Sequence, residues 1–267
     1  MPIAGVGGIE LFYERSGSGD PLLLIQGMSA ARQAWGRPFL EALEDSFECI
    51  VFDNRGVGDS SPTEAPFTIA ELAADTCGLL DTLELDRAHV LGISMGGMIA
   101  QQLALSHPDR LLSLTLGCTY CGGPGSLLLD PADFQNLAEA MASGDRGRVT
   151  RVMWELNLSP GFRAEEGRFA EFAAMAESLQ VPEETMKMQM QAVVTHDTHA
   201  RLPELLTPTL VIHGTADRVL PYPNGELIAS LMPNAHLQTL TDVGHMFWWE
   251  QPTRSAELIR AYAPASA

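Results

Sequence analysis

The amino-acid sequence predicts an α/β fold: a mostly parallel, doubly wound sheet flanked by helices, with a helical cap inserted between two late strands. Short, continuous apolar runs alternate with longer segments of helical periodicity, as in a parallel sheet buried on both faces. The strand signal is then absent from residues 122–204. The chain has 267 residues, 46% of them apolar. A chain of this size can bury roughly three quarters of its unfolded surface in one core.

The expected strands are short runs rich in Leu, Ile and Val that end in glycine or polar residues. They are residues 21–27 (PLLLIQG), 48–54 (ECIVFDN), 88–94 (AHVLGIS), 111–119 (LLSLTLGCT), 207–214 (TPTLVIHG) and 235–244 (AHLQTLTDVG). Helix-length segments separate most of them, which favours parallel pairing.

Two helices of the predicted core carry recognisable end signals. Residues 68–83 place apolar side chains at helical spacing, with Thr68 as the N-cap and Glu71 completing a capping box. Residues 95–110 form the next helical pattern, and Pro108 ends it.

Residues 122–204 are predicted to be helical, and we interpret them as a cap inserted into a core of residues 1–121 and 205–267. Six of the twelve methionines lie in this segment, at positions 141, 153, 175, 186, 188 and 190. Helix packing accounts for most of them, but flexible thioethers also suit irregular apolar ligands. We therefore expect a hydrophobic pocket under the cap, with Trp154, Val219 and Met246 as candidate lining residues.

The charge balance argues against several classes of partner. The chain carries 34 acidic and 16 basic side chains, a net charge of −18, and no run of Lys or Arg. Nucleic acid is therefore not an expected partner, and anionic membranes or phosphate-rich ligands would be repelled. No segment has the ~18 apolar residues of a membrane span, and no signal-peptide pattern opens the chain. We expect a cytoplasmic protein that binds neutral or weakly charged small molecules; the sequence indicates no particular oligomeric state.

The cysteines and histidines indicate neither a metal site nor a cofactor. Four cysteines in a chain of this length do not form a disulfide framework, so reduced thiols are expected. Cys118 and Cys121 have CxxC spacing, but no second CxxC or histidine pair completes a zinc site. His196 and His199 likewise have no third ligand.

Residues 92–96, Gly-Ile-Ser-Met-Gly, join an apolar strand to a helix. A sharp turn of this kind strains the backbone at Ser94 and crowds the positions two residues before and after it, where Gly92 and Gly96 stand. The turn lifts the hydroxyl clear of the sheet and directs the positive end of the helix toward the reacting group. Ser94 is therefore the candidate nucleophile.

A serine hydroxyl needs a general base, and the base needs an orienting carboxylate. Asp217 stands in a loop directly after an apolar strand, and His245 stands in a loop after the last strand, preceded by glycine. These two residues are the candidates for the acid and the base.

Four motifs make the chain resemble the α/β-hydrolases over nearly its whole length, the inserted helices excepted. They are DNRGVGDS (53–60), GISMGG (92–97), HGTAD (213–217) and GHMFWWEQP (244–252). The resemblance implies a nucleophile, acid and base in the chain order Ser94, Asp217, His245. It also implies an oxyanion hole made by the backbone N–H groups of Met28 and Met95.

The sequence departs from the family pattern at Gln26, because the turn after that strand usually reads His-Gly. Since the expected oxyanion donors are backbone groups, a glutamine there is compatible with the same reaction. Its amide can donate a hydrogen bond to neighbouring loops, in a supporting role like that of the usual histidine.

These residues predict a cofactor-independent serine hydrolase that cleaves a small, mainly apolar carboxylic ester or lactone through an acyl-enzyme on Ser94. His245 would be the general base and Asp217 the orienting acid. Residues 92–119 are similar to the corresponding stretch of enol-lactone hydrolases of aromatic catabolism.

Two alternatives remain open. The same triad supports hydrolysis of a C–C bond, or perhydrolase and haloperoxidase chemistry. A different class is a ligand-binding receptor that retains the triad but turns over slowly. Dehalogenation and epoxide hydrolysis are disfavoured, because Ser94 rather than an aspartate occupies the nucleophile position.

Overall fold

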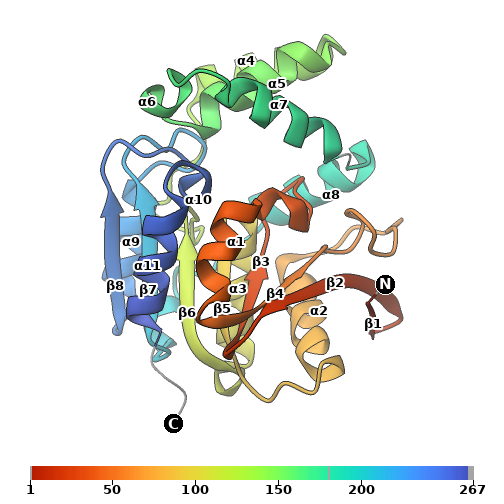
Figure 1. The fold of residues 1–267 in the computed structure, drawn as a ribbon, viewed down its shortest axis with the longest axis vertical. Coiled ribbons are helices and arrows are strands. Elements are labelled where there is room, and N and C mark those ends of the chain that lie inside the picture. Colours follow the sequence, from red (N-terminus) through yellow and green to blue (C-terminus); the bar gives the residue numbers. More distant parts are fainter. Residues whose placement is uncertain (1, 180, 264–267) are drawn as a thin grey trace.

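The computed structural model describes residues 2–179 and 181–263 as an eight-stranded sheet with helices on both faces (Figure 1). The strands are β1 (Ile3–Val6), β2 (Ile9–Gly17), β3 (Asp20–Ile25), β4 (Phe47–Phe52), β5 (Ala88–Ile93), β6 (Leu111–Gly117), β7 (Thr209–Gly214) and β8 (Ala235–Leu240). Their order across the sheet is β1-β2-β4-β3-β5-β6-β7-β8. Strand β2 is antiparallel to β1 and β4, and all other pairs are parallel. The predicted mostly parallel, helix-flanked sheet is confirmed.

The helices are one-turn 3₁₀ segments and α-helices of four to fourteen residues. They are η1 (Arg32–Trp35), α1 (Arg37–Glu44), α2 (Ile69–Thr82), α3 (Met95–Ser106), η2 (Pro108–Arg110), α4 (Pro131–Ala142), α5 (Arg146–Asn157), α6 (Pro160–Arg163), α7 (Arg168–Ser178), α8 (Glu183–Val194), η3 (Leu202–Glu204), α9 (Pro223–Leu231), α10 (Phe247–Glu250) and α11 (Pro252–Tyr262).

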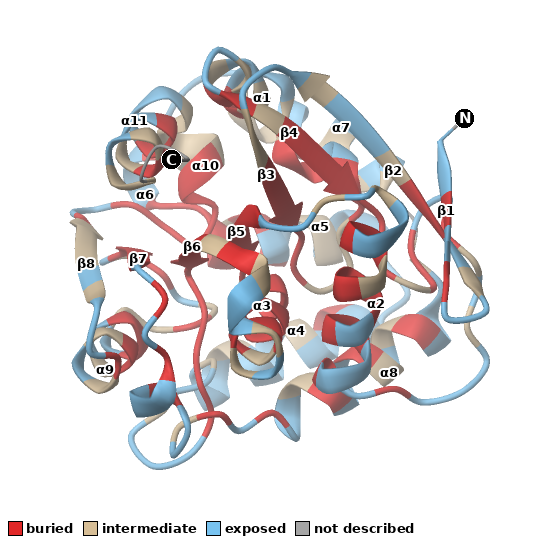
Figure 2. Ribbon diagram, turned by 90° about the horizontal axis from the view of Figure 1, so that it is seen from below, coloured by how far each residue is buried: buried red, intermediate tan, exposed pale blue. Residues whose placement is uncertain are grey.

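The two faces of the sheet bury two separate apolar clusters, as the alternation of side chains along β3 illustrates. Leu23 and Ile25 join a cluster that includes residues of α2, α3 and α9, whereas Leu22 and Leu24 join a cluster with residues of α1, α10 and α11. Side chains of one strand point alternately to opposite faces, so a strand covered on both faces must be apolar throughout. Figure 2 shows that the central strands are buried, whereas the flanking helices have buried and exposed faces.

The predicted helix ends are confirmed at α2 and α3. The Thr68 side chain accepts a hydrogen bond from the Glu71 N–H, and the Glu71 carboxylate accepts one from the Thr68 N–H, which is the expected capping box. Helix α3 ends at Ser106, two residues before Pro108.

Among the described residues, the five α-helices α4 to α8 and the 3₁₀ segment η3 lie between β6 and β7 in the chain. Helices α4 to α7 form a layer beyond the end of the sheet at which β6 finishes (Figure 1). Helix α8 returns to the core: the Tyr120 hydroxyl donates to the Val193 carbonyl at 2.5 Å, and the Ser29 N–H donates to Gln189 Oε1 at 2.9 Å. The segment is therefore attached to the loops at the carboxyl ends of the strands.

The turn between β5 and α3 is packed so closely that only glycine fits at two positions. A Cβ on Gly92 would lie 2.2 Å from the Gly96 carbonyl oxygen, and a Cβ on Gly96 would lie 2.1 Å from that of Ile25. Both distances are well inside van der Waals contact, and the obstructing atoms are backbone. Gly92 and Gly96 thus let β3, β5 and α3 approach one another, as the crowding argument from the sequence required.

We expect Gly96→Ala to lower the free energy of unfolding by about 3 kcal/mol, the upper end for overpacking, because the Ile25 backbone would have to move. Chemical denaturation monitored by circular dichroism measures this. Gly161→Ala is the matched control, since no atom lies within 4 Å of a Cβ at that helical glycine. Equal stability of the two variants would contradict the packing argument.

Candidate functional site

Ser94 stands at the turn that these glycines make possible, between the end of β5 and the first residue of α3. Its backbone has φ 52° and ψ −123°, a strained conformation for a residue with a side chain. The Ser94 N–H donates to the Gly117 carbonyl oxygen at 3.0 Å, which fixes the turn against the end of β6. Ser94 is half-buried, so its hydroxyl is held at the sheet edge rather than inside the core.

Asp217 lies in the loop after β7, and its buried carboxylate is fully hydrogen-bonded. Oδ2 is 2.8 Å from His245 Nδ1, and Oδ1 accepts from the N–H groups of Val219 and Leu220 at 2.9 Å each. Burial raises the pKa of Asp217, but the charge of His245 and the hydrogen bonds from His213 and His245 outweigh it and lower that pKa to about 2. The group is therefore a carboxylate at every ordinary pH.

His245 lies in the loop after β8 and is buried apart from 4% of its surface. Because its Nδ1 faces an ionised carboxylate, Nδ1 carries the proton and Nε2 is the free basic nitrogen. Strands β5, β6, β7 and β8 are consecutive neighbours and parallel. The loops that carry Ser94, Asp217 and His245 consequently emerge at one edge of the sheet.

Cys118 directly follows β6, the strand that lies between β5 and β7 in the sheet. Its thiol is fully buried, and burial together with the charge of Asp217 raises its pKa well above the ordinary value, although contact with the Ser94 backbone opposes the shift. The thiol is thus neutral. All four cysteines are free and buried, so the CxxC of Cys118 and Cys121 forms no disulfide.

His213 is a site residue to which the sequence analysis assigned no role. It is completely buried at the end of β7, with Nε2 at 2.8 Å from the Leu220 carbonyl oxygen and 3.2 Å from Asp217 Oδ2. Since both neighbours are acceptors, Nε2 carries the proton. His213 therefore helps to fix the same carboxylate oxygen that faces His245. In the sequence, the only indication of this role was that His213 stands four residues before Asp217.

The loop after β3 approaches Ser94 closely. A Cβ on Gly27 would lie 3.0 Å from Ser94 Cβ and 3.5 Å from its Oγ. The Gly27 N–H donates to Gln26 Oε1 at 3.2 Å, and the Ser29 N–H donates to Gln189 Oε1 at 2.9 Å. Between them, the Met28 N–H has no hydrogen-bond partner among the described residues.

The structure defines the hydrogen bonding of the Gln26 side chain, which the sequence left open. This side chain is buried and accepts a hydrogen bond from the next backbone N–H, while its Nε2 has no partner among the residues described. It therefore supports the loop as an acceptor, not as a donor to neighbouring loops.

Residues of the DNRGVGDS motif, in the loop after β4, also bind the loop after β3. The buried Asp53 carboxylate accepts from the Arg32 N–H at 2.8 Å and from the Arg32 guanidinium at 2.5 Å. The Asn54 side-chain amide donates to the Gln26 carbonyl oxygen at 3.4 Å. The loops after β3 and β4 are thus joined by a buried ion pair and by hydrogen bonds.

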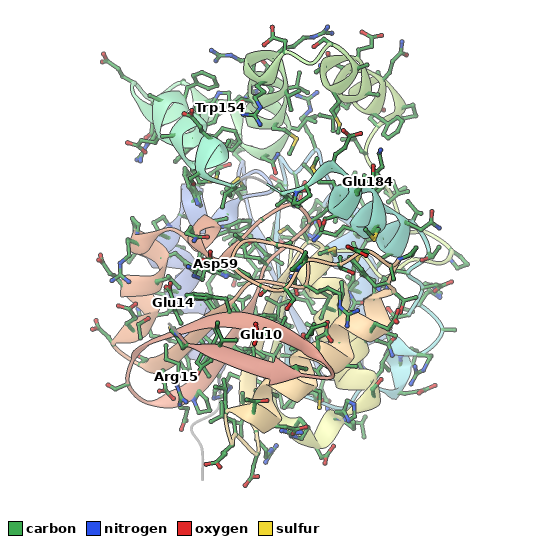
Figure 3. All side chains as sticks on the ribbon, turned by 90° about the vertical axis from the view of Figure 1, so that its right-hand side faces the viewer. Glu10, Glu14, Arg15, Asp59, Trp154 and Glu184 are labelled. Atoms are coloured by element: carbon green, nitrogen blue, oxygen red, sulfur yellow. The ribbon has the colours of Figure 1, made fainter. Side chains whose placement is uncertain are left out.

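Of the three candidate pocket residues, Trp154 and Met246 belong to one buried apolar cluster, whereas Val219 lies beside another. Trp154 is 3% exposed and packs in the inserted helices against Phe162, Phe169 and Phe172 (Figure 3). Val219 is half-buried beside the core cluster that Met28 also contacts, and Met246 is 6% exposed. Lining of a pocket by these three residues stays a prediction.

The methionines of the inserted segment are divided between surface and core. Met141, Met153 and Met190 are 50%, 36% and 41% exposed, so they lie on the outside of the protein. Met188 packs against the core cluster, as does Met28. Met141, Met153 and Met190 are therefore not part of the apolar core, whereas Met188 packs against it.

Within residues 2–179 and 181–263, no helix has the length and apolarity that crossing a bilayer requires. In the same part of the chain, no cluster of three or more His, Cys, Asp or Glu side chains is arranged to hold a metal ion.

Comparison with known proteins connects this geometry to a family. The profile of the α/β hydrolase fold matches residues 20–252. RutD of Azorhizobium caulinodans, which has the provisional name carbamate hydrolase, is 30% identical, with 92% of each chain covered. The enol-lactonase from Burkholderia xenovorans LB400 superposes with a TM-score of 0.84 at 25% identity, covering 98% of this chain and 99% of that one. A thermophilic esterase from Thermogutta terrifontis gives 0.80 at 29% identity, covering 97% and 95%. The chain therefore belongs to the α/β hydrolase fold family.

Proposed function

We propose that the protein is a serine hydrolase that cleaves small, mainly apolar carboxylic esters or lactones through an acyl-enzyme on Ser94. The observation that carries the proposal is the buried Asp217–His245 pair, at 2.8 Å, on the same sheet edge as the strained Ser94 turn. A carboxylate, an imidazole and a serine hydroxyl at one edge are the parts that acyl transfer needs.

In the first half-reaction, His245 Nε2 takes the Ser94 proton while Oγ attacks the ester carbonyl carbon. The tetrahedral intermediate then collapses, the C–O bond to the alcohol breaks, and the imidazolium returns its proton to the departing oxygen. Water attacks the acyl-enzyme by the same route and releases the carboxylic acid. With a lactone, the departing oxygen stays attached and the product is a hydroxy acid.

Asp217 remains a carboxylate throughout this cycle because its pKa is held near 2. It keeps the Nδ1 proton on His245, so that Nε2 faces the reaction, and it stabilises the imidazolium when that forms. His213 and the backbone N–H groups of Val219 and Leu220 hold the carboxylate in position.

The negative charge on the carbonyl oxygen would be stabilised by two backbone donors. Met95 is the first residue of α3, so its N–H is among those that have no partner within the helix. The unpartnered Met28 N–H, held between two bonded neighbours, would be the second. Each such donor is typically worth about 3 kcal/mol in the transition state.

Three observations favour an uncharged, mainly apolar substrate. The net charge of −18 disfavours anionic ligands. Met28 and Val219, in the loops after β3 and β7, both pack against the apolar core cluster. An enol-lactonase and an esterase are among the similar solved structures.

We further propose that residues 122–204 act as a cap over this site. The support is that two parts of the segment contact the site loops: Gln189 on α8 binds the Ser29 N–H, and Asn157 at the end of α5 accepts from the Met246 N–H at 3.1 Å. Such a cap would exclude water and limit the size of the acyl group.

The first test is hydrolysis of p-nitrophenyl esters from acetate to decanoate, with a panel of small lactones, by the wild type and Ser94→Ala. We expect a clear optimum of chain length in the wild type and a loss of kcat of about 10³-fold or more in the variant, because the nucleophile is gone. Thermal melts show whether the variant is folded. Equal turnover by both proteins, or none by the folded wild type on any ester or lactone, would contradict the proposal.

A second test separates the role of Asp217 from that of a generic charge. Asp217→Asn should reduce kcat by about 10⁴-fold with little change in KM, because an amide favours the wrong tautomer of His245. Asp242→Asn is the matched control: it removes an exposed charge from the loop before His245, at a φ of 58° that asparagine tolerates. Similar activity of the two variants would show that Asp217 does not orient the base.

A further inference from the structure

Glu250, the last residue of α10, joins the base loop to the inserted helices. Its Oε1 accepts from the Gly244 N–H at 2.9 Å and from the Ser159 N–H at 2.7 Å, and its Oε2 accepts from the Ser159 hydroxyl at 2.5 Å. Gly244 directly precedes His245, whereas Ser159 is the N-cap of α6. One carboxylate therefore connects two segments about ninety residues apart in the chain.

The His245 loop is held on both sides by this junction between α5 and α6. While the N–H of Gly244 binds Glu250, the N–H of Met246 donates to the Asn157 carbonyl oxygen at 3.1 Å. The contact is tight: a Cβ on Gly244 would lie 2.7 Å from the Asn157 oxygen and 2.8 Å from Glu250 Oε1. Displacing the junction would release both residues that flank the base.

The three polar groups that contact Glu250 all donate to it, so its side chain acts as an acceptor. The pKa of Glu250 is raised, because burial outweighs the hydrogen bonds from Ser159 and Gly244 and the charge of Arg163. The Arg163 Nε is itself buried and has no hydrogen-bond partner among the described residues. Arg163 thus acts on Glu250 through its charge, and the three hydrogen bonds to the carboxylate come from Gly244 and Ser159.

We propose that Glu250 is a positioning residue of the hydrolase: it fixes His245 by tying the Gly244 N–H to Ser159 of the inserted helices. This inference rests on the proposed function, in which His245 is the general base. It makes the α5–α6 junction part of the active machinery, so that the insertion cannot lift at this point without disturbing the base.

The geometry distinguishes the length of the side chain from its charge. In Glu250→Gln, the amide oxygen can occupy the Oε1 position and accept both N–H groups, while Nε2 donates to the Ser159 oxygen, which can act as an acceptor. Glu250→Asp keeps the charge but is one methylene too short to bridge the two segments. Glu250→Ala leaves both N–H groups unpaired, at a cost in stability.

The experiment compares kcat, KM and melting temperature of these three variants on the best ester, with Glu257→Ala as the control. Glu257 lies on α11 in an exposed pair with Arg254. We expect Glu250→Gln to stay within about threefold of the wild type, and the Asp and Ala variants to lose kcat by about 10- to 100-fold at unchanged KM, since a misplacement near 1 Å costs up to about 10²-fold.

The downfield imidazole N–H proton of His245 in the NMR spectrum reports its bond to Asp217 without any substrate. This resonance should persist in Glu250→Gln and should broaden or vanish in Glu250→Asp. The Asp variant therefore tests the inference even if Glu250→Ala does not fold. Unchanged kcat and an unchanged resonance in Glu250→Asp, or equal losses in the Gln and Asp variants, would overturn the inference. Absence of turnover in the wild type would instead contradict the proposed function, while the NMR comparison would still test the positioning of His245.

Discussion

The close backbone approach at the Ser94 turn is the constraint on which the site depends. Gly92 and Gly96 leave room only for hydrogens against the Gly96 and Ile25 carbonyl oxygens, and this packing places the end of β5 beside the end of β3. The serine is thereby held in a strained backbone conformation within reach of the loop after β3. The rest of the site follows from strand order, because β6, β7 and β8 continue the sheet from β5 in parallel.

Buried carboxylates that are paired with hydrogen-bond donors also hold the loops of the site in place. Asp217 is held by two backbone N–H groups and two histidines, and Asp53 joins the loops after β3 and β4 through Arg32. Glu250 does the same for the base loop and the inserted helices. In a low-dielectric interior such fully bonded carboxylates fix geometry strongly, since each lost partner leaves an unpaired buried group. The loops that carry the candidate site are consequently joined to the rest of the fold by buried hydrogen bonds.

Local pattern was sufficient to predict the parallel sheet, the α2 capping box and the turn at Ser94. Local pattern did not predict strands in which buried and exposed residues alternate. It also did not predict the roles of residues whose partners are distant in the chain. Strands β1 and β2 were not predicted. Strand β1 alternates buried and exposed residues, and only two of the nine residues of β2 are buried, so neither strand forms a continuous apolar run. The roles of His213 and Glu250 depend on contacts made only in the folded chain. The Gln26 side chain accepts a hydrogen bond from the Gly27 N–H. That contact also depends on the folded backbone, and the spacing of residues in the sequence does not predict it.

The most direct test of the central claim is the covalent reactivity of Ser94. The protein is treated with a fluorophosphonate, and the adduct is located by intact mass and peptide mapping. The arrangement of Ser94, His245 and Asp217 predicts one adduct per chain, on Ser94, formed in competition with an ester substrate. No adduct, or an adduct elsewhere with Ser94 unmodified, would contradict the assignment of Ser94 as the activated nucleophile.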